Sequence, residues 1–257
     1  MTGPDPHELL RVEGLSRSFG GLVVASDISI RLAAGDRVAL IGPNGAGKAT
    51  FINLVTGALR PSAGRILLAG EDVTDASDVA RVRRGLVRSF QVTRLFGDMT
   101  ACEHVALAIL QRERQTHRIF SDVWAIGSVA EEAQALLDEL GISAVGELRV
   151  REIAYGQQRL LELAVAVALR PKVLLLDEPA AGVPQSEAPR ILEVLEALPA
   201  GIAVLMIEHD MDLVFRFARR VAVLAGGRLI FEGTPAEVAA DSRVREAYLG
   251  SYAHGAA

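Results

Sequence analysis

Hydrophobic residues in the chain fall into short apolar runs and longer segments where they recur at helical spacing. Apolar runs of the kind that form buried strands occupy 37–41, 173–176 and 202–207. Segments with helical spacing or helix-forming composition occupy 50–55, 101–117, 129–140, 154–170, 185–198 and 211–219. The alternation of buried strands with helices predicts an α/β fold whose central strands are parallel.

Weaker strand patterns flank these segments. The β-prone segments 9–12 and 23–32 alternate with glycine turns at Gly14, Gly20 and Gly21, which predicts a small antiparallel sheet near the N-terminus. The segment 64–70 adds a strand. The segments 221–224 and 228–232 meet at Gly226 and Gly227 and predict a hairpin.

The segment 92–156 carries helical patterns with no strand pattern between them, so we interpret it as a helical insert. We therefore expect a single domain over 1–257. Its core and β subdomain would comprise 1–91 and 157–250, its helical subdomain 92–156, and its tail 251–257.

A glycine-rich loop joins the strand at 37–41 to the helix at 50–55. Glycines allow backbone N–H groups to turn inward, the start of the helix adds a positive dipole end, and Lys48 supplies a cation for phosphate oxygens. The loop therefore predicts a nucleotide-phosphate site, with an ordinary glycine turn as the alternative. The residues that would contact the nucleotide are Gly42, Pro43, Asn44, Gly45, Ala46, Gly47, Lys48, Ala49 and Thr50.

Charged residues follow two of the apolar runs. Asp177 and Glu178 come directly after 173–176, and His209 comes shortly after 202–207. Because ligands bind at the carboxyl ends of parallel strands, we expect these side chains at one rim of the sheet. Adjacent residues face opposite ways, so Asp177 could reach Mg²⁺ while Glu178 points to the water beyond a γ-phosphate. Solvated acids in a strand-end turn and a structural histidine are the alternatives.

Composition narrows the classes of partner. The 257-residue chain carries a net charge of −5, so it lacks the cationic field that attracts nucleic acid. Cys102 is the only cysteine, which excludes a disulfide framework and a cysteine-based zinc site, and we expect it to be a small buried hydrophobe. No apolar stretch reaches the ~18–20 residues of a spanning helix, so we expect a soluble protein.

Arginines cluster around Gln91, and we expect most of them to form a solvated helix face. They are Arg81, Arg83, Arg84, Arg88 and Arg94.

The order of the motifs resembles the ATP-binding subunit of ABC transporters over about 9–250. GPNGAGK resembles the Walker A motif, Gln91 in RSFQVTRLF the Q-loop, AYGQQR the ABC signature, VLLLDEP the Walker B motif, and His209 the switch histidine. Phe19 matches the aromatic residue that stacks on adenine. The segments RSFQVTRLF, YGQQR, DEPAAG and EGTPAEV most resemble the ATPases of branched-chain amino acid importers.

The resemblance implies a RecA-like P-loop core with an antiparallel β subdomain and a helical ABC subdomain. Two such subunits pair head to tail, and each ATP lies between the glycine-rich loop of one subunit and the signature motif of the other. The signature residues in this chain would be Ala154, Gly156 and Gln157. Gln91 would couple the Mg²⁺ site to the helical subdomain, which docks on a membrane permease. Asp177 would hold Mg²⁺, Glu178 would polarise the attacking water, and His209 would contact the γ-phosphate.

The implied function is ATP hydrolysis that powers import of branched-chain amino acids or a related small polar solute, from the cytoplasmic face of the membrane. The sequence departs from the family pattern at Ala49, which replaces a Mg²⁺-binding hydroxyl, at Ala154, which replaces the signature serine, and at Pro184. These departures favour a heterodimer with a second, distinct ATPase subunit. They also leave open a binding or regulatory module with weak hydrolysis. An ABC protein acting on nucleic acid or ribosomes fits poorly, because a second cassette and a basic surface are absent from the sequence.

Overall fold

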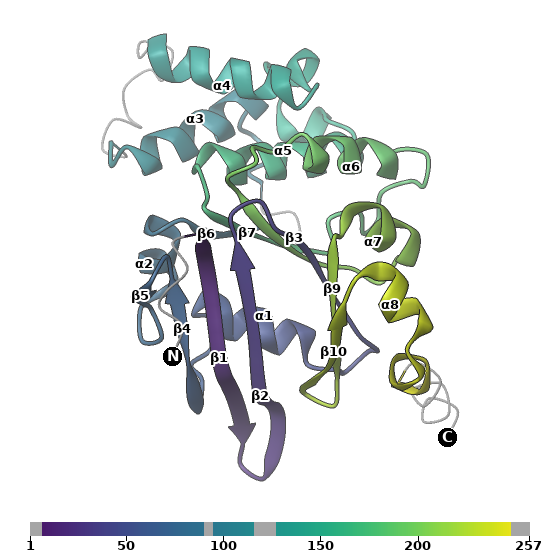
Figure 1. Cartoon of the computed structure of the whole chain (residues 1–257). Coiled ribbons are helices and arrows are strands. Elements are labelled where there is room, and N and C mark those ends of the chain that lie inside the picture. The colour runs from purple at the N-terminus through teal and green to yellow at the C-terminus, as the bar shows by residue number, and fades with distance from the viewer. Residues whose placement is uncertain (1–6, 90–94, 116–126, 248–257) are drawn as a thin grey trace. The chain divides into compact units, whose positions relative to one another are not determined.

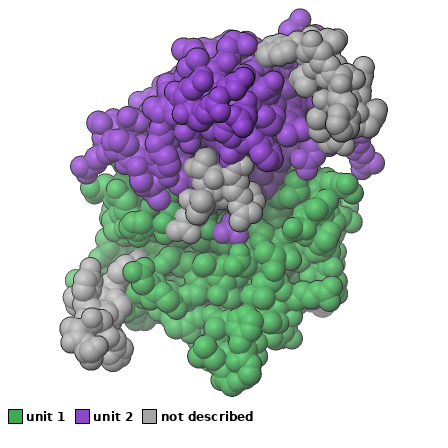
Figure 2. All heavy atoms as spheres, turned by 180° about the vertical axis from the view of Figure 1, so that it is seen from behind, with its two compact units in different colours: residues 1–86, 172–178, 198–257 green, residues 87–171, 179–197 purple. Residues whose placement is uncertain are grey.

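The computed structural model describes residues 7–89, 95–115 and 127–247 (Figure 1). The chain forms two compact units, which Figure 2 shows in different colours. Unit 1 comprises residues 1–86, 172–178 and 198–257, and unit 2 comprises residues 87–171 and 179–197. This division differs from the expected boundaries, because residues 157–171 and 179–197 group with the helices of unit 2 rather than with the core.

Unit 1 contains an antiparallel sheet of order β2-β1-β4-β5. Its strands are β1 (Glu8–Phe19), β2 (Leu22–Ala33), β4 (Ala63–Leu68) and β5 (Glu71–Asp72). The predicted sheet is therefore present, but Gly14 is not a turn as expected. It lies inside β1 with φ +59°, where the register shifts, because glycine adopts this backbone conformation at a bulge and lets the strand continue.

The second sheet has the order β10-β9-β3-β8-β7-β6, and only Leu86 of its edge strand β6 belongs to unit 1. The strands β3, β7, β8 and β9 are parallel, and β10 forms the predicted hairpin with β9. Their bounds are β3 (Arg37–Ile41), β6 (Leu86–Arg88), β7 (Val173–Asp177), β8 (Ala203–Ile207), β9 (Arg220–Ala225) and β10 (Arg228–Gly233). Every residue of β3, β7 and β8 is buried, as the apolar runs predicted.

The helices of unit 1 are α1 (Lys48–Thr56), α2 (Asp78–Arg83), α7 (Met211–Phe217) and α8 (Pro235–Ala240). One buried core joins α1 to both sheets through side chains such as Phe51, Leu15 and Leu205. The helices of unit 2 are α3 (Ala101–Arg112), α4 (Gly127–Glu139), α5 (Tyr155–Ala168) and α6 (Ala188–Glu196), with short 3-10 turns η3 (Ser143–Val145) and η4 (Val150–Glu152).

Cys102 is buried on α3 as expected, and burial raises the pKa of its thiol to about 11. Among the described residues, no helix is both long and apolar enough to cross a membrane.

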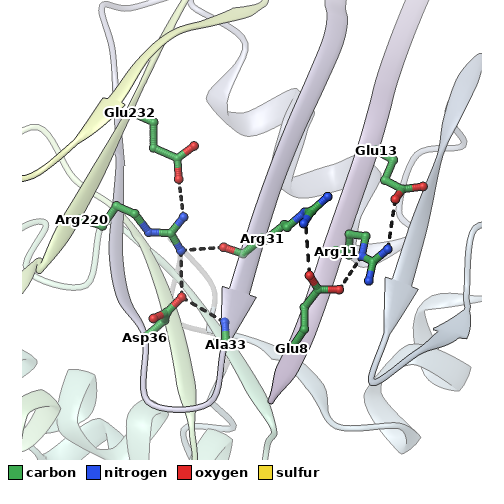
Figure 3. Close-up of polar contacts among 8 residues, drawn as sticks. All are labelled: Glu8, Arg11, Glu13, Arg31, Ala33, Asp36, Arg220 and Glu232. Carbon is green, nitrogen blue, oxygen red and sulfur yellow. Dashed lines mark hydrogen bonds and ion pairs between the residues drawn. The ribbon is translucent and has the colours of Figure 1, made fainter. Parts of the chain in front are cut away.

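Polar contacts of Arg220 link the two sheets of unit 1 (Figure 3). Its guanidinium forms ion pairs with Glu232 on β10 and with Asp36 in the β2–β3 turn, the latter at 2.8 Å. It also donates a hydrogen bond of 2.6 Å to the backbone carbonyl of Arg31 on β2. Because one side chain satisfies groups on several strands, it holds the turn that leads into β3.

Arg81 departs from the expected solvated helix face. It is 1% exposed and donates hydrogen bonds to the carbonyls of Leu54 at 2.8 Å, Val55 at 2.7 Å, Thr74 at 2.8 Å and Ala76 at 3.1 Å. Two of these carbonyls lie at the C-terminal end of α1, where the helix dipole favours a cation. Periodicity missed this role because the guanidinium is buried by tertiary contacts, and that burial lowers its pKa. Arg81 thus supports the helix that begins at the glycine-rich loop.

His104 is buried on α3 of unit 2 and holds the chain just before that helix. Its Nε2 accepts a hydrogen bond of 2.8 Å from the backbone N–H of Phe96, and its Nδ1 lies 2.9 Å from the Thr100 carbonyl. The Nδ1–H tautomer satisfies both contacts, because it leaves Nε2 as the acceptor. The Phe96 ring stacks on the imidazole, with centroids 5.9 Å apart.

Burial lowers the pKa of His104 from its ordinary value of 6.5, although the Thr100 carbonyl and Glu103 oppose the shift. The unfolded chain therefore takes up a proton at higher pH than the folded chain. We expect the free energy of unfolding to decrease as pH falls through about 6.5 toward the lower folded pKa. Urea unfolding of the purified chain at a series of pH values measures this slope. His104→Gln should flatten this slope, and a slope that the substitution leaves unchanged contradicts the assignment.

Candidate functional site

The glycine-rich loop runs from the end of β3 to the start of α1 in unit 1. Gly42 has φ +155°, and a Cβ there would lie 2.1 Å from the carbonyl oxygen of Leu224. Gly47 has φ +101°, and its Cβ would lie 2.8 Å from the carbonyl oxygen of Val24. No side chain fits at either position, so the loop backbone packs directly against the neighbouring strands. Gly47 immediately precedes α1, which places the positive end of the helix dipole at the loop.

Lys48 is the first residue of α1, and its ammonium lies against the loop. The Nζ atom donates hydrogen bonds to the carbonyls of Gly42 at 2.6 Å and Pro43 at 3.1 Å. Burial lowers the pKa of Lys48, while the carboxylates of Glu178 and Asp177 act in the opposite direction. The loop, the lysine and both carboxylates therefore share one electrostatic environment.

The rim of the parallel sheet brings Asp177, Glu178 and His209 together in unit 1. Asp177 ends β7 and is 6% exposed, and Glu178 follows it with φ +50°. Positive φ is uncommon for a residue with a side chain and costs conformational energy, so the surrounding structure fixes this turn. His209 follows the end of the neighbouring strand β8, and its Nδ1 lies 3.7 Å from Oε1 of Glu178. The predicted proximity of these three residues at one rim is confirmed.

Glu208 is a residue of this rim that the sequence analysis did not single out. It is 3% exposed, and its carboxylate accepts a hydrogen bond of 3.0 Å from the backbone N–H of His209. Its Oε2 also lies 3.8 Å from the His209 Nδ1. A charged residue directly after an apolar strand was the available signal, the same one that identified Asp177. Asp210, two residues further along, caps α7 by accepting hydrogen bonds from the backbone N–H groups of Asp212 and Leu213.

The first turn of α1 carries Ala49, which is exposed, and Thr50, which is partly buried. The family pattern has a hydroxyl-bearing residue at position 49, and here an exposed alanine stands in its place. Phe19 ends β1 and is 49% exposed, with the guanidinium of Arg17 lying 4.5 Å from its ring centroid. An aromatic face is therefore available near the hairpin tip, although one side of it carries a cation.

The expected signature residues Ala154, Gly156 and Gln157 lie at the start of α5, in unit 2. Ala154 is the exposed N-cap residue and provides no side-chain cap, so amide groups of the first turn lack that partner. Gly156 is buried and faces the carboxylate of Glu187. Gln91 lies outside the described residues, as does the rest of 90–94.

The described residues contain no group of three or more His, Cys, Asp or Glu side chains that could hold a metal ion. Asp177 is nevertheless a buried carboxylate at the rim that holds Lys48 and Glu178. Mg²⁺ characteristically binds one or two carboxylates together with phosphate oxygens rather than an all-protein cage. The donor set therefore fits Mg²⁺ only in company with a nucleotide.

Residues 25–181 match the family model described as ABC transporter. Residues 228–254 match a second model, described as branched-chain amino acid ATP-binding cassette transporter. The two matches cover the glycine-rich loop, the start of α5, the β7 carboxylates, and β10, the second strand of the C-terminal hairpin.

Among curated proteins, the chain is 34% identical to the high-affinity branched-chain amino acid transport ATP-binding protein BraF of Pseudomonas aeruginosa. That alignment covers 94% of this chain and 98% of BraF. The chain is 35% identical to the protein of the same description, LivG, of Escherichia coli strain K12, again over 94% and 98% of the two chains.

The fold is also similar to solved structures. One is a nucleotide-free ATP-binding cassette from an ABC transporter, with a TM-score of 0.82 and 31% identity over 94% of this chain and 98% of the other. Another is an ATP-binding cassette in its ADP conformation, with a TM-score of 0.80 and 32% identity over 95% and 99% of the two chains. The α/β architecture read from the hydrophobic pattern is therefore confirmed.

Proposed function

Because the chain belongs to the ATP-binding subunits of ABC transporters, we propose that it powers the import of branched-chain amino acids or a related small polar solute. The observation that carries the proposal is the rim of unit 1, where Lys48 and the carboxylates of Asp177 and Glu178 share one environment. The C-terminal match at 228–254 and the names of the full-length relatives support the choice of solute.

We propose a distinct task for each residue of this rim. The loop from Gly42 to Thr50 and the ammonium of Lys48 would bind the phosphates of ATP, and Phe19 would stack on its base. Mg²⁺, held by Asp177 and, we propose, by Gln91, would neutralise phosphate charge when bound with the nucleotide. Glu178 would orient the attacking water, and His209, 3.7 Å from Glu178, would donate to the γ-phosphate.

An apolar hollow on unit 2 supports an interface with a membrane permease. It has a volume of about 170 Å³, and its apolar lining includes Val87, Leu95, Val165 and Leu169. Nearby in the sequence, Phe96 exposes 62% of its surface. An apolar hollow and an exposed aromatic ring offer a partner protein apolar area to bury. The subunit would thus be peripheral, on the cytoplasmic face of the membrane.

Ala49 and Ala154 favour pairing with a distinct ATPase subunit. In a head-to-tail dimer, position 49 serves the ATP site on this chain's own loop, whereas position 154 serves the site on the partner's loop. A homodimer would carry both defects in each site, and a heterodimer with intact motifs only one. We therefore propose a heterodimer, with weak or absent hydrolysis in a regulatory module as the second candidate function, which the same two alanines favour.

Purification from membranes tests the proposal. The chain, tagged at its N-terminus and expressed with its genomic neighbours, should co-purify with permease subunits and a second ATPase subunit, identified by mass spectrometry. Proteoliposomes containing this complex and the matching binding protein should import labelled leucine only with ATP. ATP binding without hydrolysis by the complex would favour the regulatory module, and import of an unrelated solute would contradict the assigned cargo.

A further inference from the structure

A hollow of about 190 Å³ lies within unit 2, next to the signature residues. Residues that follow α4, residues of the first turns of α5, and residues at the start of α6 line it, among them Ile142, Gly156, Leu160, Glu187 and Arg190. Its volume is below the ~300–1,000 Å³ of pockets for drug-sized ligands, so it suits a smaller molecule.

Two charged groups of opposite sign border this hollow. The Oε2 atom of Glu187 lies 1.9 Å from the position that a Cβ on Gly156 would occupy. The Nη2 atom of Arg190 lies 1.8 Å from the position of a Cβ on Gly141. Both charges therefore occupy space that exists because the facing residue is glycine, and a side chain at either position would displace them.

Helix ends favour the placement of each charge. Gly156 is in the first turn of α5, where the positive end of the helix dipole complements the carboxylate of Glu187. Gly141 follows the C-terminal end of α4, where the negative end complements the guanidinium of Arg190. Arg190 also pairs with Glu193 at 3.0 Å through Nη1, while Nη2 is the nitrogen close to Gly141.

Apolar side chains also line this hollow. Ile142, Leu160 and Ile191 line it and are 2%, 6% and 4% exposed. A ligand that fits needs an ammonium group, a carboxylate and a short aliphatic body. An anion such as phosphate lacks the ammonium group and would be repelled by Glu187, and a fatty acid lacks it as well.

We propose that this hollow binds a free amino acid with a short aliphatic side chain. Glu187 accepts from its ammonium group, Arg190 donates to its carboxylate, and the side chain packs against Leu160 and Ile191. Resting on the proposed function, this ligand is the imported solute itself. An amino acid bound against Gly156 and Gln157 hinders the signature from meeting the partner's ATP, so the delivered cargo slows the ATPase.

Calorimetric titration of the purified full chain tests binding. The probes are L-leucine, L-leucinamide, which lacks the carboxylate, and 4-methylpentanoate, which lacks the ammonium group. Leucine should bind, and each analogue should bind about tenfold or more weakly, the loss expected for one charge-assisted contact. Absence of leucine binding up to about 10 mM, a tenfold excess over a millimolar dissociation constant, overturns the proposal.

Variants assign each contact. Glu187→Gln should abolish the preference for leucine over 4-methylpentanoate, and Arg190→Gln should abolish the preference for leucine over leucinamide, because each removes the partner of one ligand group. Both side chains are exposed, so the variants should fold, which circular dichroism checks. Glu196→Gln on the same helix and Arg228→Gln on β10 are matched controls at exposed residues and should bind leucine normally. Leucine binding that is indifferent to Glu187→Gln and Arg190→Gln overturns the site.

Inhibition is measured on the complex in detergent. Leucine added to the complex should lower the ATPase rate, and Arg190→Gln should relieve this inhibition. If the complex imports leucine but the chain does not bind leucine, the hollow is not an amino-acid site, and the proposed function is unaffected. A chain that binds leucine within a complex that imports something else upholds the site and defeats the proposed cargo and the feedback.

Discussion

Glu178→Gln should leave ATP bound and stop its hydrolysis. The amide keeps the size of the carboxylate but loses the negative charge that, in the proposed function, orients and activates the attacking water. Such a group typically contributes about 10²- to 10⁴-fold in rate. Glu178 follows the buried strand β7 and lies 3.7 Å from the His209 Nδ1, so the neighbouring geometry should survive the change. Steady-state phosphate release by the complex measures the loss, and nucleotide binding measured by filter retention checks that the site is intact.

Two further variants serve as comparisons. Lys48→Ala removes the cation of the glycine-rich loop and should weaken ATP binding about tenfold or more, the loss of one charge-assisted interaction. Glu196→Gln is the same chemical change as Glu178→Gln at an exposed residue of α6, and it should change neither ATP binding nor hydrolysis. Turnover that persists in Glu178→Gln at the rate of the unaltered complex would show that another residue activates the water.

Ala49→Thr and Ala154→Ser should each speed hydrolysis by the proposed heterodimer, by roughly tenfold or more, since one lost stabilising donor typically costs about 10²- to 10³-fold. In that heterodimer the two changes would restore different ATP sites, one on this chain's loop and one on the partner's loop. Their effects should therefore combine independently in the double variant. The chain alone, with both defects in every site of a homodimer, should be nearly inactive. Phosphate release by the chain, the complex and the three variants measures these differences.

The stability of the variants must be measured alongside their rates of hydrolysis. Serine at position 154 would also cap α5, which lacks a side-chain cap, and should stabilise the protein by about 0.5–2 kcal/mol without any effect on chemistry. Thermal unfolding separates that gain from a gain in rate, and Ala240→Ser at an exposed residue of α8 reports the effect of an added hydroxyl elsewhere. A homodimer that hydrolyses ATP as fast as an intact pair, indifferent to both substitutions, would leave the alanines as tolerated variation.

Local patterns were sufficient for the elements that carry the site. The strands before Gly42, Asp177 and Glu208 are fully buried, so their apolar runs identified them without any knowledge of their partners. The order of strands and helices then placed Asp177, Glu178 and His209 at carboxyl ends of strands, and parallel pairing of β7 with β8 brings those ends together.

Local patterns did not predict the polar contacts of three residues. These residues are Arg81, Glu208 and His104. Burying a polar or charged residue costs free energy unless the residue is hydrogen-bonded. All three are buried, and each makes a hydrogen bond with a backbone group. Periodicity records which side of an element faces water and contains no information on which carbonyl or amide will meet a particular side chain.

The sequence alone determined the order of buried strands and helices, the glycine-rich loop before α1 and the charged residues after β7 and β8, because these depend on local spacing and backbone freedom. Only the tertiary structure decided that Arg81 would hold the end of α1, that Glu208 would be buried beside His209, and that Glu187 and Arg190 would border one hollow. These contacts depend on how separate elements pack, and packing sets distances between residues that no local pattern connects.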